Sequence, residues 1–377
     1  MSEIFDAVIA GAGVNGATTA LFLARGGMRV ALLDRGAICR EASGVNAGTL
    51  TMQMTRVALM PFALEAHAMW ADAPRWLGHD VGVVVCDGLS LAFTEGEAAL
   101  LTERAARRRE AGAPIEIIDG RRACAVEPGL SPDVLIAGHC KVDGYANAYL
   151  TGLAYRRALI DAGVVLHENT EVRGVDRVRD AWVLHGGTAT LRARRVILAG
   201  GVWLEPMAAW FGVRLPIKTL VNQLSVTERI APVMRTVIGI ASGLLSLKQY
   251  PHGTVVIGGG WQGKGDRDTG ATELEPESLI GNVRLACHTI PALVRSRIAR
   301  AWLGFEAETA DALPAVGALP GREGVYTIGS VHSGYTSGIC IAKLFAEQLL
   351  GRQPHLSLAG FDPARLIVAD TSYPSAD

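Results

Sequence analysis

The sequence predicts an α/β fold, because a strand, a glycine-rich turn and a helix follow one another near its beginning. The apolar run Asp6–Ala10 ends in a turn with three glycines, Gly11–Gly16. Apolar residues then recur at helical spacing until Gly26–Gly27 interrupts them. A second apolar run, Arg29–Leu33, ends in Asp34 and completes a βαβ unit. This order is typical of a Rossmann-type unit that binds a dinucleotide.

Each glycine of the turn has a physical role in such a unit. Gly11 permits the tight turn, Gly13 lets the backbone approach a pyrophosphate, and Gly16 lets the helix pack closely on the strand. The N-terminus of the helix adds N–H donors and a positive dipole. Asp34, at the end of the second strand, is placed to accept the hydroxyls of a ribose. The motif predicts a dinucleotide and is compatible with both NAD and FAD.

Later elements alternate between helices and strands. The Thr-x-x-Glu pattern of Thr94–Glu97 predicts a capped helix that runs to about Glu110. A helix is predicted over Ala148–Ala162, with a strand directly after it. The predicted strands are Val164–Leu166, Ala181–Leu184, Arg195–Ala199, Thr254–Ile257 and Val325–Gly329. A last helix is predicted over Ile339–Leu350, entered through a glycine-containing loop.

Composition and charge exclude several classes of protein. The 377 residues are enough for more than one domain. The net charge of -1 provides no field that would attract nucleic acid or an anionic membrane. The six cysteines show no CxxC spacing, so we expect no metal site. Acidic residues at the start and the lack of a long apolar run predict no signal peptide and no membrane span. We therefore expect a cytoplasmic protein.

Four further segments narrow the choice of cofactor. Glu41–Gly48 is rich in Ser, Gly and Asn, and Arg195–Trp203 is a strand that ends in an Ala-Gly-Gly turn. Asp311–Gly317 has the form Asp-x-x-Pro-x-x-Gly, and Gly334–Gly338 precedes the last helix. In this order they resemble the D-amino-acid oxidase family of FAD-dependent flavoproteins, which includes glycine oxidase and sarcosine oxidase. The resemblance covers nearly the whole chain.

The resemblance implies a Rossmann-type FAD-binding domain of the glutathione-reductase-like kind, with an inserted mixed β-sheet substrate domain. The FAD-binding domain is expected to be discontinuous, over residues 1–85, 140–215 and 305–377, and the substrate domain to comprise 86–139 and 216–304. Some branches of the family attach the flavin through a Cys or a His. Here Gly304–Gly317 contains no Cys and Ser43–Gly48 contains no His. We therefore expect FAD to be bound non-covalently.

The residues expected to contact FAD come from the glycine turn, the loop after the second strand, two middle strands and the closing loop. They are Gly11, Gly13, Asn15, Gly16, Asp34, Arg35, Ser43, Asn46, Ala47, Gly48, Val172, Ala199, Gly200, Trp203, Gly334, Tyr335, Thr336, Ser337 and Gly338. A packing role in the core is the other interpretation of Trp203.

The resemblance also implies an activity, the oxidation of a C–N bond in an amino acid or secondary amine. A hydride would pass from the carbon next to a neutral amine to N5 of the flavin, and the resulting imine would hydrolyse. Both oxygen and a carrier fit the motifs as electron acceptors. One alternative is the flavin subunit of a multi-subunit dehydrogenase, similar to the opine and hydroxyproline dehydrogenases, which passes electrons to partner subunits. A non-catalytic FAD-binding scaffold is the alternative of another class.

Glu306 marks a departure from the family pattern. Relatives that oxidise amino acids place an Arg in a Gly-x-Arg-Pro stretch, where it holds the substrate carboxylate. The corresponding stretch here begins at Gly304, and Glu306 occupies the Arg position. A carboxylate there would repel that of an amino acid. Glu306 is therefore expected either to bind a cationic part of the substrate or to point to solvent or to a structural Arg.

Four other residues are candidates for substrate binding, and no catalytic residue is assigned. Lys248 is expected to anchor a carboxylate, to favour oxygen activation or to lie at the surface. Tyr250 and Gln223 stand where family members contact the substrate. His332, just before the closing loop, is expected either to contact the flavin ring or substrate or to form a hydrogen bond within a turn.

Overall fold

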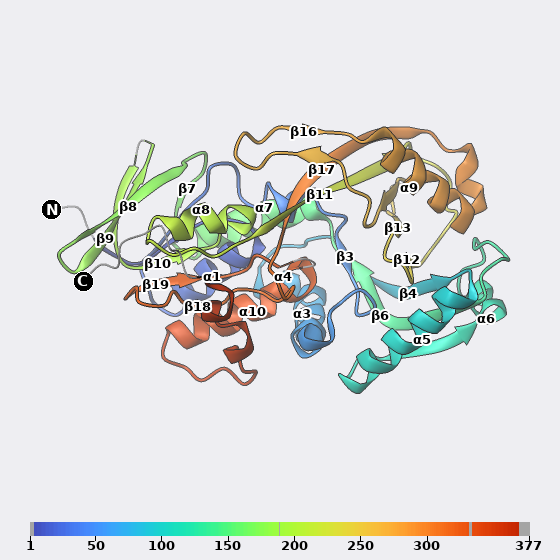
Figure 1. Ribbon diagram of the computed structural model, residues 1–377, viewed down its shortest axis with the longest axis horizontal. Coiled ribbons are helices and arrows are strands. Elements are labelled where there is room, and N and C mark those ends of the chain that lie inside the picture. The colour runs from blue at the N-terminus through green and yellow to red at the C-terminus, as the bar shows by residue number, and fades with distance from the viewer. Residues whose placement is uncertain (1–3, 188, 332–333, 369–377) are drawn as a thin grey trace.

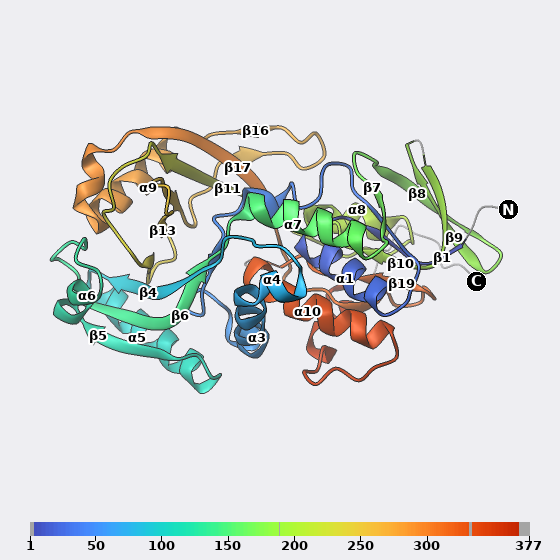
Figure 2. The same ribbon diagram turned by 180° about the vertical axis from the view of Figure 1, so that it is seen from behind.

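The computed structural model describes residues 4–187, 189–331 and 334–368, whose strands form two large sheets and one short ribbon. The first sheet lies toward one end of the long axis of the molecule and the second toward the other (Figure 1 and Figure 2). The architecture is α/β with a mixed sheet beside the dinucleotide-type sheet, as the sequence predicts.

The first sheet is built around the predicted βαβ unit. From edge to edge its strands are β18 (Gly317–Ala318), β19 (Val325–Thr327), β10 (Ala189–Leu198), β1 (Ile4–Ala10), β2 (Val30–Leu33) and β7 (Val165–His167), with β9 (Ala181–Gly186) and then β8 (Val172–Val178) beside β10. β1 pairs in parallel with β2 and β10, and β7 and β19 extend the parallel order on the two sides. β1 and β2 are almost entirely buried, which explains why they appear in the sequence as continuous apolar runs.

Four helices share one apolar core with this sheet. They are α1 (Val14–Arg25), α3 (Met60–Ala71), α7 (Ala148–Asp161) and α10 (Gly334–Leu349), with α4 (Ala73–Trp76) after α3. α1 packs against α7 and α10, and α10 packs against α3. Their buried faces share one apolar cluster, to which α1 contributes Leu21, α7 contributes Tyr155 and α10 contributes Phe345. The beginning and the end of the chain are therefore held together by one core.

The second sheet is mixed and mostly antiparallel. Its strands are, in order, β17 (Ile298–Glu308), β11 (Lys218–Thr227), β14 (Val255–Gly258), β13 (Ser246–Gln249), β12 (Val237–Ile240), β4 (Val84–Ala92), β6 (Ile136–Tyr145) and β3 (Thr49–Leu50), with β5 (Ile115–Asp119) also on β6. Only β12 and β4 pair in parallel among these described strands. The accompanying elements are α5 (Glu95–Glu110), α6 (Gly120–Val126), α9 (Pro276–Thr289) and the ribbon of β15 (Lys264–Gly265) and β16 (Thr272–Glu273).

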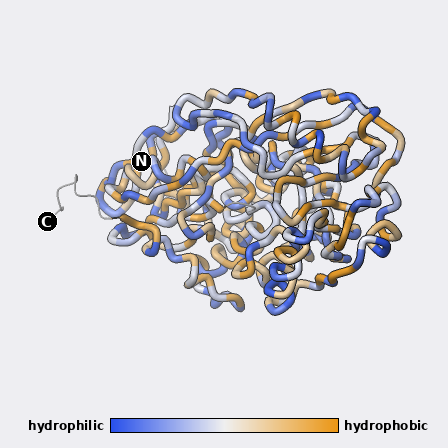
Figure 3. Tube along the Cα trace, turned by 45° about the vertical axis from the view of Figure 1, so that its right-hand side comes forward, coloured by the Kyte–Doolittle hydropathy of each residue, from blue (hydrophilic) through white to orange (hydrophobic). Residues whose placement is uncertain are grey.

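The predicted cap at the start of α5 is confirmed. The hydroxyl of Thr94 accepts from Glu97 N at 3.2 Å and the Glu97 carboxylate accepts from Thr94 N at 3.2 Å, which is the capping box expected at the start of α5. Hydrophobic segments run through the middle of the molecule, and many outer loops are hydrophilic (Figure 3). Within the described ranges, every helix is too short or too polar to cross a membrane.

The last helix differs from its prediction, because it begins at Gly334 and not at Ile339. The glycines of this segment suggested a loop. A Cβ on Gly338 would collide with the Asn15 side chain of α1, so this glycine allows two helices to approach closely. The predicted division into domains stays a proposal, and its boundaries after 85, 139 and 304 fall inside β4, β6 and β17.

Candidate functional site

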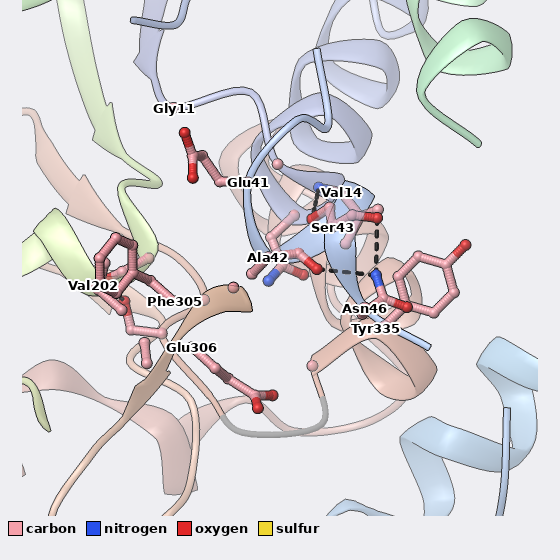
Figure 4. Close-up of a pocket in the computed structure, with 18 of the residues that line it drawn as sticks. Gly11, Val14, Glu41, Ala42, Ser43, Asn46, Val202, Phe305, Glu306 and Tyr335 are labelled. Atoms are coloured by element: carbon pink, nitrogen blue, oxygen red, sulfur yellow. Dashed lines mark hydrogen bonds between the residues drawn. The ribbon is translucent and has the colours of Figure 1, made fainter. Parts of the chain in front are cut away.

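A cavity of about 550 Å³ lies between the two sheets. Its lining includes Ala10 and Leu33, at the ends of β1 and β2, and Asn222 and Phe305 from the second sheet. The loop after β2 forms another wall, and the first turn of α10 completes it (Figure 4). Segments that are far apart in the sequence therefore build one space at the carboxyl ends of parallel strands, where α/β proteins bind ligands.

The three glycines of the first turn differ in what surrounds them. Gly11 has a φ of +110°, and a Cβ there would collide with the carbonyl of Ala199. A Cβ on Gly16 would collide with the carbonyl of Gly11 and come within 3.0 Å of the Ala199 Cβ. A Cβ on Gly13 would meet only Ser43 Oγ, at 3.2 Å, among the described atoms within 4 Å. The fold itself requires Gly11 and Gly16, whereas the space in front of Gly13 belongs to the cavity.

Two long helices begin at the cavity wall. Gly13 and Asn15 line it at the start of α1, and residues 334–336 line it at the start of α10. The N-cap Gly13 of α1 supplies no side-chain cap, and Val14 N donates to Ser43 Oγ at 3.0 Å. Asn15 Oδ1 is buried and has no hydrogen-bond partner among the described residues. Backbone donors and two helix dipoles together fit a ligand that carries phosphates.

Asp34 lies on the cavity wall where the sequence predicts a ribose-binding acid. Its carboxylate accepts from Ala12 N at 2.7 Å and from Gly36 N at 2.8 Å. Burial nevertheless raises the pKa of Asp34 above its usual value. The guanidinium of Arg35 lies 3.4 Å above the ring of Trp203, and both residues line the cavity. This stack gives the cavity a rigid amphipathic wall beside Asp34.

The loop after β2 is organised by Asn46. Its Nδ2 donates to the carbonyls of Ala42 and Ser43 at 2.9 and 2.8 Å (Figure 4). Its Oδ1 accepts from Gly48 N at 2.6 Å. Gly48 has a φ of +73°, and a Cβ there would collide with the carbonyl of Ala146. Asn46 and Gly48 thus determine the shape of the loop that borders the cavity.

All but four of the predicted FAD contacts line the cavity. The exceptions are Gly16, Gly48, Ser337 and Gly338. Gly16 and Gly338 lie at close approaches between α1 and its neighbours, and Gly48 lies at the end of the loop. Ser337 is buried, and its hydroxyl has no partner among the described residues. That these residues bind FAD stays a prediction that the geometry supports.

The substrate candidates are less well placed. Glu306 lines the cavity, whereas Gln223 and Tyr250 do not. Gln223 is 2% exposed, and its amide bonds both backbone groups of Glu275 at 2.8 and 3.1 Å. The Tyr250 hydroxyl lies 3.3 Å from the carbonyl of Ala146, and burial raises its pKa. His332 lies outside the described residues.

Strand alternation identifies a residue that the sequence prediction missed. Side chains of a strand alternate between two faces, so the neighbours of Gln223 in β11 point the other way. Those neighbours, Asn222 and Leu224, line the cavity. Pairing the polar residue with the correct face of β11 would have selected Asn222 in place of Gln223.

Lys248 is buried behind the cavity wall, with 0% of its surface exposed, so the interpretation as a surface lysine is wrong. Its amine donates to the Ala47 carbonyl at 2.8 Å and to Thr49 Oγ1 at 2.5 Å. Burial lowers the pKa of Lys248 to about 7. Ser246 Oγ is a third acceptor, 3.5 Å from the amine. Lys248 supports the segment that borders the cavity, and it is not one of the lining residues.

The lowered pKa of Lys248 predicts how stability depends on pH. Unfolding returns its pKa from about 7 toward 10.5, so between these values the unfolded chain binds the additional proton. The free energy of unfolding should therefore gain a contribution that grows as pH rises from about 7. Urea unfolding at several pH values up to about 10 should show that contribution lost in Lys248→Met. Identical pH profiles for the variant and the wild type would contradict the prediction.

Comparison with known proteins agrees with this geometry. The chain matches the family described as FAD dependent oxidoreductase over residues 6–348. The protein belongs to this family. Glycine oxidase of Geobacillus kaustophilus is 27% identical, over 97% of this chain and 98% of the relative. An opine oxidase subunit of Rhizobium meliloti is also 27% identical, over 96% and 97%. The crystal structure of the Geobacillus glycine oxidase superposes with a TM-score of 0.86 at 25% identity, over 97% of this chain and 99% of that one.

An FAD-dependent oxidoreductase must hold both a pyrophosphate and a flavin ring. The start of α1, with Gly13, would hold the pyrophosphate, and Asp34 would hold the ribose next to the adenine. The start of α10 would face the flavin, where its N–H groups stabilise negative charge. Within the described residues, no cluster of three His, Cys, Asp or Glu side chains is arranged to hold a metal ion. Non-covalent attachment of the flavin stays a prediction.

Proposed function

We propose that this FAD-dependent oxidoreductase oxidises a C–N bond of an amino acid or secondary amine. The observation that carries the proposal is the continuity of the cavity, which extends from the glycine turn to Glu306 of the second sheet. A cofactor at the first sheet and a small substrate at the second would therefore share one space. When bound, FAD supplies the acceptor for a hydride from the carbon that carries the nitrogen. The likeness to glycine oxidase, over 97% of this chain, supports an amine as the substrate.

The residues of the chain position the substrate and exclude water. Val45, Leu224 and Phe305 give the cavity an apolar wall, and the side chain of Phe305 is 6% exposed. Trp302 of β17 donates from Nε1 to the Val45 carbonyl at 2.7 Å, which ties the second sheet to the loop after β2. An apolar, preorganised wall favours the neutral amine over its ammonium form. A neutral amine is the form that can release a hydride.

The direct test is anaerobic reduction of the bound flavin by a panel of D-amino acids, N-methyl amino acids, proline derivatives and opines. At least one amine should bleach the visible absorption of the flavin in a single phase of saturable rate. The 2-hydroxy acids with the same carbon skeletons are the matched control and should leave the flavin oxidised. Reduction by the hydroxy acids alone would show that a C–O bond, and not a C–N bond, is the target.

A second candidate is the flavin subunit of a multi-subunit dehydrogenase. The observation in its favour is the likeness to the opine oxidase subunit of Rhizobium meliloti, which extends over 96% of this chain and 97% of the relative. Purification from the native source should then recover further subunits at fixed stoichiometry, and the isolated chain should reduce oxygen slowly. Rapid turnover of the isolated chain with oxygen would favour an independent oxidase. A non-catalytic scaffold gains no support from relatives that are named as oxidases.

A further inference from the structure

A carboxylate lies in the cavity wall that the second sheet provides. Glu306 is on β17, opposite Leu220 of β11, and lines the cavity together with Asn222 and Phe305. Figure 4 draws Glu306 in the lower part of the view, with Gly11 of the glycine turn in the upper part. The end of the cavity away from the predicted pyrophosphate site is therefore bordered by an acidic side chain.

A series of three hydrogen bonds, which starts at a backbone N–H, determines that this carboxylate accepts a hydrogen bond. Val221 N donates to Gln262 Oε1 at 2.8 Å, so the amide nitrogen of Gln262 must face the other way. That nitrogen donates to Asn222 Oδ1 at 2.5 Å. The nitrogen of Asn222 then faces Glu306 and donates to its Oε2. Because a backbone N–H can only donate, each amide orientation follows from the one before it. Glu306 Oε2 is thus fixed as a hydrogen-bond acceptor.

The charges around the cavity reinforce this polarity. Its described lining residues include five acids and two bases, namely Asp34, Glu41, Glu171, Asp268 and Glu306 against Arg35 and Arg40. Arg35 is stacked on Trp203 and pairs with Glu41 at 3.3 Å. The next outward carboxylate of β17, Glu308, is absent from the lining and pairs with Arg56 at 3.2 Å and Lys218 at 3.1 Å. Among these acids, Glu306 is the one that β17 of the second sheet contributes.

We propose that Glu306, positioned by Asn222 and Gln262, binds a second cationic group of the substrate, an ammonium or a guanidinium, apart from the amine that is oxidised. The inference rests on the proposed function, since it names the substrate class of the same cavity. A guanidinium presents parallel N–H donors that match the oxygens of a carboxylate. A substrate with an alkyl group at this position gains no such contact, and one with a carboxylate there is repelled.

Two racemic substrates that differ only in the side-chain terminus provide the test. Nα-methylarginine carries a guanidinium, and N-methylnorleucine carries an alkyl chain. The measured quantity is the anaerobic rate of flavin reduction divided by the dissociation constant. The wild type should favour the arginine compound by roughly tenfold or more, as expected for a charge-assisted hydrogen bond. In Glu306→Gln this preference should disappear. The ratio of rate to dissociation constant should fall for the arginine compound and stay within about twofold for the norleucine compound.

Glu308→Gln is the matched control, because it removes the same charge from the same strand at a residue that does not line the cavity. It should keep the preference for the arginine compound. An unchanged preference in Glu306→Gln, or an equal loss for both substrates, would overturn the inference and leave C–N oxidation intact.

A binding measurement keeps the inference separate from the proposed function. If neither compound reduces the wild-type flavin, the proposed oxidation of such amines fails. The binding of butylguanidinium, which needs no oxidation, then tests the inference about Glu306. Titration of the holoenzyme, followed by the perturbation of flavin absorption, should give binding roughly tenfold tighter to the wild type than to Glu306→Gln. Equal dissociation constants in the two proteins would overturn the inference.

Discussion

Replacing Gly13 by valine should yield a folded, soluble protein that no longer holds FAD. The new side chain meets Ser43 Oγ at its Cβ and otherwise projects into the cavity, where the pyrophosphate is expected. The backbone can then no longer approach the phosphates. The flavin content of the purified protein should fall from about one FAD per chain to less than about a tenth. The ratio of visible to ultraviolet absorption measures this content, and circular dichroism measures the fold.

Two variants make this test specific. Gly174→Val places the same side chain in β8, where no described atom lies within 4 Å of the added Cβ, and should keep both fold and flavin. Gly16→Val should fail to fold, because its Cβ collides with the Gly11 carbonyl. Stoichiometric flavin in soluble Gly13→Val would show that the pyrophosphate does not pass this glycine.

Replacing Asp143 by alanine should lower the free energy of unfolding by roughly 3 kcal/mol or more. The carboxylate is 1% exposed and accepts from Thr51 Oγ1 at 2.7 Å, Met52 N at 2.8 Å and Gln53 Nε2 at 3.3 Å. Burial raises the pKa of Asp143, whereas the hydrogen bonds from these three donors lower it. Alanine leaves three donors of one turn without their acceptor. Urea unfolding of the holoenzyme measures the loss.

Asp87→Ala is the matched control for this prediction. Its carboxylate is 45% exposed and contacts His139 Nε2 at 2.6 Å, so its removal should cost about 1 kcal/mol or less. Thr51 lines the cavity, and Asp143→Ala should therefore also change the flavin absorption spectrum, whereas Asp87→Ala should not. Equal losses of stability in the two variants would contradict the assigned role of Asp143.

The cofactor half of the site could be predicted from the sequence because its signals are local. The role of Gly11 follows from a turn between a strand and a helix that are its direct neighbours, and Asp34 ends the strand that follows. In such short-range patterns, neighbouring residues alone determine the local structure. The closing segment borders the cavity as expected but is helical from Gly334, since a glycine that permits close helix packing looks in sequence like a glycine that forms a loop.

The substrate half could not be predicted at the same level because its geometry is long-range. Asn222 reaches Glu306 through the register of β11 with β17, and reaches Gln262 through a bridge with another segment. No local pattern specifies either pairing. Gln223, one position away, faces the other side of the sheet for the same reason. The burial of Lys248 likewise arises from segments about two hundred residues earlier, at Ala47 and Thr49.

The pairing of β1 with late strands has a consequence for the newly made protein. β1 and α1 are synthesised first, but β10, β19 and α10 complete the sheet and the core that cover them. At ribosomal speeds of about 5–20 residues per second, roughly 15–60 s separate the synthesis of β1 from that of β19. During this interval the apolar faces of the first unit depend on chaperones or transient local contacts. Capture of the flavin is therefore a late event in biogenesis, and chains that end before α10 lack a wall of the binding site.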